Sequence, residues 1–415
     1  LHWEIDKNHL DSPQWITTSR LLRLGEAIEF DFFAPSGIGP GQLVIFERYL
    51  EQYEDTGGIA VDGDLSWLDG NSSEELPLIF SDNRASMAYR PAEPGNYLAR
   101  WNIDSEVLYR YFAVIEDDWV VLRFSTGVGL DPFPNWHATG IPLDYRLPVV
   151  RFGKECMSYP GESGQFDPDD PVFQVLKEYH WRYGDAVIPH LPDTPEMDMD
   201  SRIKYYGDLL DSVKILMPDP NAIRSARVSM RHDLDPGYTQ TFARLNVHDH
   251  CGLEEANCPP WLGMPEFPYF SSLVDCRKVN QGSRNSVVAH QWDFCGGWHF
   301  LGPTIWHHEM SEGRWELTEN CLRQGIIEAE NMADLSGHPA FLFPLYDGVF
   351  QRGEAEFDWA ERLQKLIAFR LTKETALAFA RSIDIADYYR RHFENTPTTV
   401  FVSQTDHLDY DRHWL

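Results

Sequence analysis

The densest group of residues able to do chemistry is the run Arg231-His232-Asp233-Leu234-Asp235. On an extended chain Asp233 and Asp235 point to the same side, because side chains alternate along a strand. Two such carboxylates can share a metal ion or divide the roles of general base and metal ligand. The alternative is a helix N-cap, since the following Asp-Pro-Gly is ordinary turn chemistry. A cap requires only one Asp, so we predict Asp233 as catalytic, Arg231 as substrate-binding, and His232 and Asp235 as metal ligands.

A second candidate group is His248-Asp249-His250, which has H-x-H spacing. If this stretch is extended, both imidazoles face one way and His248 and His250 could hold a transition metal. If it is helical, the two rings diverge by about 200° and a shared ion is excluded. The sequence leaves both alternatives open.

A third group lies at His290-Gln291-Trp292-Asp293. His290 is a further candidate metal ligand and Asp293 a candidate catalytic carboxylate, or else this is a solvent-facing aromatic loop. Trp292 and Trp298 belong to a stretch rich in aromatic residues and glycine. Indole faces beside carboxylates suit sugar rings, whose C–H faces stack on aromatics, although a core aromatic cluster would look the same. Asp347 is the remaining candidate catalytic carboxylate.

The elements that position these residues are inferred from periodicity. Strands are expected at 140–145, 186–190, 226–230, 286–293, 340–346 and 398–403. An amphipathic helix capped by Asp198 or Asp200 buries Ile203, Tyr206, Leu210, Val213 and Met217, and further helices are expected at 316–335, 359–370 and 374–393. Polar residues recur at the expected carboxyl ends of the strands: Asp144, His190, His232, His290, Asp347 and Asp406. Strands alternating with helices predict a (β/α) TIM-like barrel over residues 126–415, whose catalytic face is formed by those ends.

Residues 1–125 have a different pattern, with short alternating strands separated by turns. Ile28 to Phe33, Leu43 to Phe46, Tyr97 to Trp101 and Val107 to Ile115 are typical strand sequences. The last two resemble the closing hairpin of an immunoglobulin-like module. We therefore predict a multidomain β plus α/β protein, with an N-terminal immunoglobulin-like β-sandwich at 1–125.

Two segments resemble the polysaccharide deacetylase (NodB-like) family over about residues 226–348. "MRHDLDPG" resembles the first Asp-x-Asp-type motif, and "CLRQGIIEAENMADLSGHPAFLFPLYDG" looks like the helix and following strand of that family. The resemblance implies that one of Asp233 and Asp235 is the general base and the other a metal ligand. The H-x-x-x-H metal motif of the family is absent, since His290 and His299 are nine residues apart.

Composition excludes several other classes. The 415 residues carry 65 acidic and 35 basic side chains, a formal charge of −30, so neither nucleic acid nor an anionic membrane surface is an expected partner. No apolar run approaches the roughly 18 residues of a membrane span. The six cysteines include no C-x-x-C pair, which disfavours zinc-finger and thioredoxin-like chemistry. The first residue is Leu1, which indicates a removed signal peptide or a trimmed chain, and a secreted or periplasmic location is expected.

The sequence thus predicts a carbohydrate-active hydrolase with a glycan substrate, with a divalent metal such as zinc as the expected cofactor. One alternative is a metal-free glycoside hydrolase in which Asp233 pairs with Asp293 or Asp347. The other is a protein that binds a glycan without turning it over. The sequence does not indicate an oligomeric state.

Overall fold

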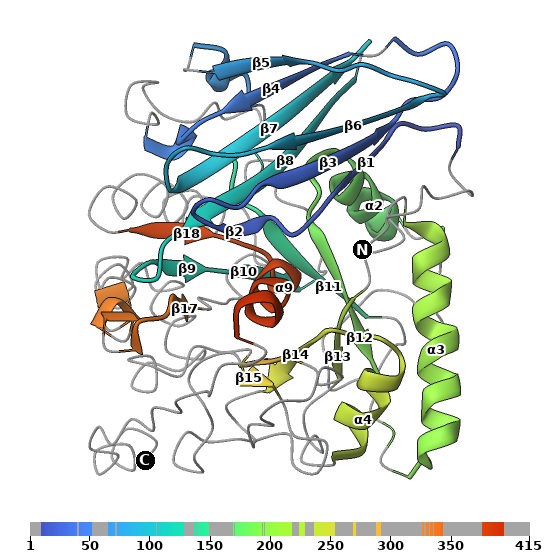
Figure 1. Cartoon of the computed structure of the whole chain (residues 1–415). Coiled ribbons are helices and arrows are strands. Elements are labelled where there is room, and N and C mark those ends of the chain that lie inside the picture. Colours follow the sequence, from blue (N-terminus) through green and yellow to red (C-terminus); the bar gives the residue numbers. More distant parts are fainter. Residues whose placement is uncertain are drawn as a thin grey trace, which may run out of the picture.

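Figure 1 shows the computed structural model of the chain, with its β-rich N-terminal part above a mixed part of strands and helices. The structure describes residues 10–39, 41–51, 65–70, 73–104, 106–127, 137, 139–148, 169, 171–192, 194, 196–217, 224–228, 236–253, 269–270, 288–291, 326–342 without 328, 332 and 335, and 376–393.

The N-terminal part is a sandwich of two sheets. One sheet has the antiparallel order β1 (Gln14–Thr17), β3 (Ile28–Phe33), β6 (Arg84–Tyr89). The other has the order β2 (Leu21–Arg23), β8 (Glu106–Ile115), β7 (Gly95–Ile103), β4 (Gln42–Phe46), β5 (Ser73–Pro77), in which only β2 and β8 are parallel. A short 3₁₀ helix, η2 (Ser66–Gly70), precedes β5.

Alternating side chains account for this sandwich. In β3, Phe30 and Phe32 are buried, whereas Glu29 is exposed. The inner faces of the two sheets meet in an aromatic core, where the ring centroids of Phe32 and Trp101 are 4.8 Å apart. The β-rich architecture expected for the N-terminal part is therefore present, whereas an immunoglobulin-like arrangement of its strands is not shown.

The second part is built on parallel strands. A seven-stranded sheet has the order β10 (Phe124–Gly127), β11 (Leu143–Pro148), β12 (Ala186–Leu191), β13 (Ser225–Val228), β14 (Asp249–Leu253), β16 (Val288–Gln291), β15 (Tyr269–Phe270), and only β15 is antiparallel. A three-stranded parallel sheet has the order β17 (Ala340–Leu342), β9 (Val120–Leu122), β18 (Leu377–Phe379).

Helices connect consecutive parallel strands. α2 (Pro171–Tyr183) lies between β11 and β12, α3 (Met199–Leu216) between β12 and β13, and α4 (Pro236–Arg244) between β13 and β14, while α9 (Ser382–Phe393) follows β18. The alternation of strands and helices expected from the sequence is confirmed here. Among the described residues the seven-stranded sheet ends at β10 and β15, so closure into a barrel is not confirmed.

The helix α3 shows how local sequence sets these bounds. Asp198 caps it, with its side chain accepting a hydrogen bond from the Ser201 amide at 3.0 Å. Tyr206, Leu210 and Val213 recur at helical spacing and are buried, as expected.

One continuous group of buried side chains joins the sandwich to the parallel strands. It includes Val44, Phe46, Leu98 and Tyr111 from the sandwich and Leu122, Leu143, Val187 and Phe379 from the parallel part. Because this core contains side chains from both sides of residue 125 in the sequence, the sandwich and the parallel strands pack against each other. The division into domains at 125 and 126 stays a prediction. No helix in the described ranges is long and apolar enough to cross a membrane.

Two expected elements differ from the structure. The helix predicted over 374–393 is wrong at its start, because Leu377–Phe379 form β18 and pair with β9. Their side chains are buried on both faces, and this packing outweighs the helical preference of the alanine-rich sequence. The strand predicted at 140–145 begins later, at Leu143, since Gly140 adopts a left-handed turn with φ +73° and Pro142 lacks an N–H. Asp144 is therefore the second residue of β11 rather than its carboxyl end.

Candidate active site

Three neighbouring parallel strands end at one edge of the sheet. β14 lies between β13 and β16, with Ala226 opposite His250 and His250 opposite Ala289. The strands end at Val228, Leu253 and Gln291, and adjacent strands lie about 4.8 Å apart. The chain therefore leaves β13 and β16 at points separated by about two strand spacings, roughly 10 Å. We call this the carboxyl edge, defined by the ends of β13, β14 and β16.

The principal sequence candidates follow these strand ends in the chain. Asp233 comes five residues after the end of β13, and Asp293 comes two residues after the end of β16. Their roles stay predictions, because these candidates lie outside the described residues: Arg231, His232, Asp233, Asp235, Trp292, Asp293, Trp298 and Asp347.

Two of the candidate histidines lie on strands, and only their backbone positions are described. His250 lies in β14 and His290 in β16, where His290 is opposite Cys251 rather than His250. The helical alternative for this stretch is wrong, since β14 begins at Asp249, but His248 precedes the strand, and the metal role of His248 and His250 stays a prediction. Just after helix α4, Asn246 takes a left-handed φ of 56°, and Val247 donates to the Phe242 carbonyl at 3.0 Å, which ends the helical turn.

His248 has other partners than a metal. Its Nδ1 lies 3.6 Å from Oδ1 of Asp387 on α9, and its Nε2 lies 3.1 Å from Oδ1 of Asn246. Arg224 reaches the same Asp387 carboxylate, with Nη2 3.0 Å from Oδ2. Arg224 precedes β13 and His248 precedes β14, so this group lies at the amino ends of the strands. That position does not favour His248 as a ligand at the carboxyl edge. No group of three His, Cys, Asp or Glu side chains in the described ranges could hold a metal ion.

A buried ion pair lies where β9 and β10 meet. Arg123 Nε donates to Asp144 Oδ2 at 2.6 Å, and both side chains are at most 1% exposed. The backbone amide and the hydroxyl of Ser382 donate to the same oxygen at 3.0 and 2.7 Å. Asp144 Oδ1 has no hydrogen-bond partner among the described residues. Burial raises the pKa of Asp144, and the facing Arg123 and Ser382 only partly offset this. Asp144 therefore fastens the start of α9 to β11, and its burial excludes contact with a substrate.

A second buried group joins the sandwich to α9. Arg20 Nη1 and Arg381 Nη1 donate to the Gly184 carbonyl at 2.8 and 2.7 Å. Arg381 also binds Asp384 through Nε–Oδ2 at 2.6 Å and Nη2–Oδ1 at 2.9 Å. Burial alone would raise the pKa of Asp384, but the charge and hydrogen bonds of Arg381 hold it below its usual range.

A buried His–Asp pair was not anticipated from the sequence. His137 Nε2 lies 2.6 Å from Asp185 Oδ2, and Tyr183 stacks on the imidazole with centroids 3.9 Å apart. The backbone carbonyl of Asp185 lies 2.6 Å from His180 Nδ1. Such a pair could move a proton, but His137 is only 1% exposed, so we interpret it as a structural contact between His137, which precedes β11, and the turn that joins α2 to β12. No motif marks it, because His137 and Asp185 are far apart in sequence.

Comparisons with known proteins give no family assignment. No protein-family model matches the sequence, and no curated protein matches it. The chain is similar to two solved glycoside hydrolases. One is a cell-surface-expressed, multi-modular chitinase from Paenibacillus, with 9% identity and a TM-score of 0.21, and the match covers 58% of this chain and 24% of the chitinase. The other is a β-glucuronidase from Ruminococcus gnavus in complex with D-glucuronic acid, with 9% identity and a TM-score of 0.27, and the match covers 89% of this chain and 60% of the β-glucuronidase. The chain thus spans less than two thirds of either structure. TM-scores this low do not establish a shared fold.

Proposed function

We propose that this chain is a carbohydrate-active hydrolase whose catalytic carboxylates emerge at the carboxyl edge. The observation that supports this is the arrangement of β13 and β16, which are parallel, flank β14 and are followed in the sequence by Asp233 and Asp293. In parallel α/β architectures ligands bind outside the carboxyl ends of strands, whether the sheet is open or closed as a barrel. A barrel over 126–415 and an immunoglobulin-like sandwich at 1–125 remain part of the proposal.

The chemistry best matched to this arrangement uses two carboxylates. One of Asp233 and Asp293 would protonate the leaving oxygen, and the other would act as a nucleophile or activate water. Strand ends roughly 10 Å apart leave room for the separations of both retaining enzymes, about 5 Å, and inverting enzymes, about 6.5–9.5 Å. Asp347 is the substitute partner, and Trp292, Trp298 and Arg231 would hold the sugar. A glycan substrate agrees with a secreted or periplasmic location, which we include in the proposal.

A second candidate is metal-dependent deacetylation, which the resemblance of "MRHDLDPG" favours. A bound divalent ion would supply a hydroxide at neutral pH and polarise the ester or amide carbonyl. Asp235, His232, His250 and His290 are its candidate ligands. The described residues do not bring a complete ligand set together, so this version depends on the sequence alone.

The deciding experiment is Asp233→Asn in the full chain, with Asp208→Asn on the exposed surface of α3 as the matched control. Turnover is measured on acetylated xylan and chitin as released reducing ends and as released acetate, with and without a chelator. We expect Asp233→Asn to lower turnover at least ~10²-fold, as loss of acid–base catalysis does, without changing the melting temperature.

Each readout separates the candidates. Reducing ends that survive the chelator support the glycosidase, and acetate that disappears with the chelator supports the deacetylase. Near wild-type turnover in Asp233→Asn would exclude this residue as the catalytic centre. Binding without any turnover in the unmodified chain would contradict both hydrolases and support a glycan-binding protein.

A further inference from the structure

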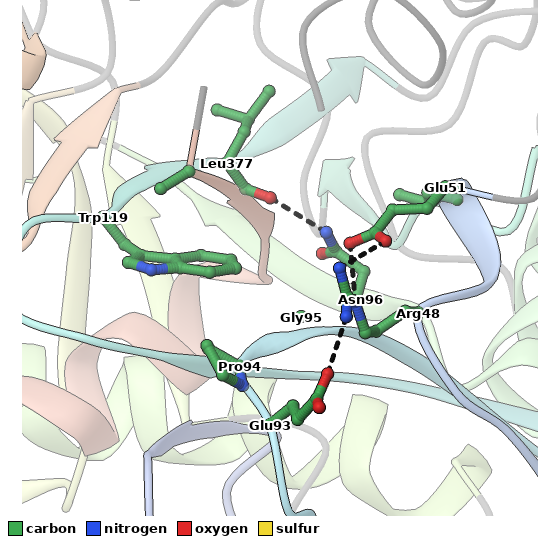
Figure 2. Close-up of a pocket in the computed structure, with 10 residues that line it drawn as sticks. Arg48, Glu51, Glu93, Pro94, Gly95, Asn96, Trp119 and Leu377 are labelled. Carbon is green, nitrogen blue, oxygen red and sulfur yellow. Dashed lines mark hydrogen bonds and ion pairs between the residues drawn. The ribbon is translucent and has the colours of Figure 1, made fainter. Parts of the chain in front are cut away.

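A cavity of about 240 Å³ lies between the sandwich and the amino ends of β9 and β18. Figure 2 shows Arg48, Glu51 and Glu93 on one side and Trp119 on the other, with Asn96 next to Arg48 and joined by a hydrogen bond to the Leu377 carbonyl. Trp119 directly precedes β9, and Leu377 is the first residue of β18. The cavity therefore lies at the amino ends of two parallel strands, and none of its lining residues belongs to the carboxyl edge.

The polar wall is a clamp around Arg48. Glu51 binds the guanidinium twice, through Nε–Oε1 at 2.8 Å and Nη2–Oε2 at 2.6 Å. Glu93 binds it from the other side, with Nη1–Oε2 at 2.6 Å. The hydrogen bond and charge of Glu51 raise the pKa of Arg48, whose guanidinium is charged at any ordinary pH. Donors and acceptors thus lie side by side on one fixed surface.

The backbone is adapted to hold Arg48 in this place. Arg48 has a left-handed φ of 46°, which is unfavourable for a residue with a Cβ. Gly95 lies against it, and a Cβ at Gly95 would come within 2.7 Å of Arg48 Cγ. The side chains of the ion pairs are between 40% and 62% exposed, so they add little stability to offset this strain. Strained backbone conformations cluster at binding sites, where the surrounding structure holds them in place.

The opposite wall is apolar. Trp119 is half-buried, and Pro94 and Leu377 line the cavity beside it. Asn96 lines the cavity and connects its two walls. Its side-chain Nδ2 donates to the Leu377 carbonyl at 2.9 Å, and its Oδ1 accepts from the Phe379 backbone amide at 3.1 Å. Its side chain is thus held in one orientation between β7 and β18.

We propose that this cavity binds one sugar residue of a glycan chain, as a second subsite apart from the carboxyl edge. A sugar ring presents C–H faces that stack on an indole and hydroxyls that both donate and accept, which matches Trp119 facing the Arg48 clamp. The volume equals about eight waters in the liquid, which suits a single ring rather than a drug-sized ligand. Two carboxylates beside one guanidinium disfavour an anion. The glycan class rests on the proposed function.

The test reads out Trp119 directly. The full chain is labelled with 5-fluorotryptophan, and the ¹⁹F resonance of Trp119 is assigned by its loss in Trp119→Phe. The methyl glycosides of glucose, N-acetylglucosamine, xylose, galactose and mannose are the probes. We expect at least one to shift this resonance saturably at millimolar concentration, while the resonance of Trp181, whose Nε1 donates to the Pro13 carbonyl at 2.8 Å, stays unchanged.

Variants of the clamp complete the test. Arg48→Met should weaken binding about tenfold, as loss of charge-assisted hydrogen bonds does, whereas Arg23→Met, which removes an exposed ion pair with Asp117 outside the cavity, should leave it unchanged. A Trp119 resonance that responds to no probe, or binding that is unaffected in Arg48→Met, would overturn the subsite. Turnover plays no part in this readout, so a responding Trp119 in a chain without hydrolysis would refute the hydrolase and leave the subsite standing.

Discussion

The buried pair of Arg123 and Asp144 allows a quantitative prediction about stability. Arg123→Met keeps much of the side-chain volume but removes the cation that faces a fully buried carboxylate. Removing one partner of a buried pair typically costs about 3–5 kcal/mol. The two donors of Ser382 remain on Oδ2, so we expect the lower end, roughly 3 kcal/mol. The free energy of unfolding from urea titrations followed by circular dichroism measures this loss.

The partner substitution should behave differently. All three donors converge on Oδ2, so in Asp144→Asn the side-chain carbonyl can take that position, keep every hydrogen bond and place the NH₂ group where Oδ1 stands. Asp144→Asn leaves the buried Arg123 guanidinium without its counter-charge, but it also removes a carboxylate whose charge is penalised by burial, so it should cost less than Arg123→Met. The double variant Arg123→Met/Asp144→Asn should then be more stable than Arg123→Met alone.

Acidification supplies a further check with a definite sign. A carboxyl with a raised folded-state pKa weakens the fold as pH rises from its unfolded pKa, 3.8, through its folded pKa. Removing Arg123 raises the folded pKa further, so the loss in Arg123→Met should shrink as pH falls toward 4. A loss that does not depend on pH, or a double variant as unstable as the sum of the single ones, would refute the buried-charge explanation.

Two further predictions concern local contacts. The pKa of Glu26 is lowered to about 2 although burial opposes this, first by a hydrogen bond with His392, so its stabilisation is present above pH 4.5 and lost as pH falls toward 2. Because Glu26 is only half-buried and solvent screens its charge, Glu26→Gln should lower the free energy of unfolding by only about 1 kcal/mol at pH 7. In urea titrations the difference in unfolding free energy between wild type and Glu26→Gln should narrow below pH 4.5, and a difference that stays constant with pH would contradict this explanation. Gly41 and Gly37 both have positive φ, but a Cβ at Gly41 would meet a backbone carbonyl oxygen at 2.1 Å while Gly37 faces open space. Gly41→Ala should therefore lower the melting temperature clearly more than Gly37→Ala, and equal losses would disprove the clash.

The sequence predicted elements well wherever one periodic pattern dominates. The alternating apolar residues of β3 and the helical face of α3 are both confirmed, because each pattern reflects burial on one side. Prediction failed at β18, where Leu377, Ala378 and Phe379 are buried on both faces. A strand buried on both faces has no alternation, so only its pairing with β9 distinguishes it from a helix.

The strands that precede the candidate site were predictable for the same reason, whereas the site itself stays a prediction. Strand ends follow from local patterns, so the sequence alone could place Asp233 and Asp293 near the ends of strands. The buried contacts Arg123–Asp144 and His137–Asp185 could not be predicted, since each joins segments whose proximity is a result of the fold. The sequence marks Asp144 as a polar residue on a strand, but only its burial shows that it holds the fold together rather than acting on a substrate.

One end of the seven-stranded sheet is anchored by buried charges. At the amino ends of β10 and β11, Arg123, Asp144 and Ser382 hold α9 against the sheet through charges taken out of water, and such charges stabilise only while every partner is present. A sheet anchored firmly at one end leaves the loops at the other end able to carry reactive side chains, because their positions are set by strands that do not depend on them. Under the proposed function, substitutions at Arg123 should therefore change stability, whereas those at Asp233 should change turnover.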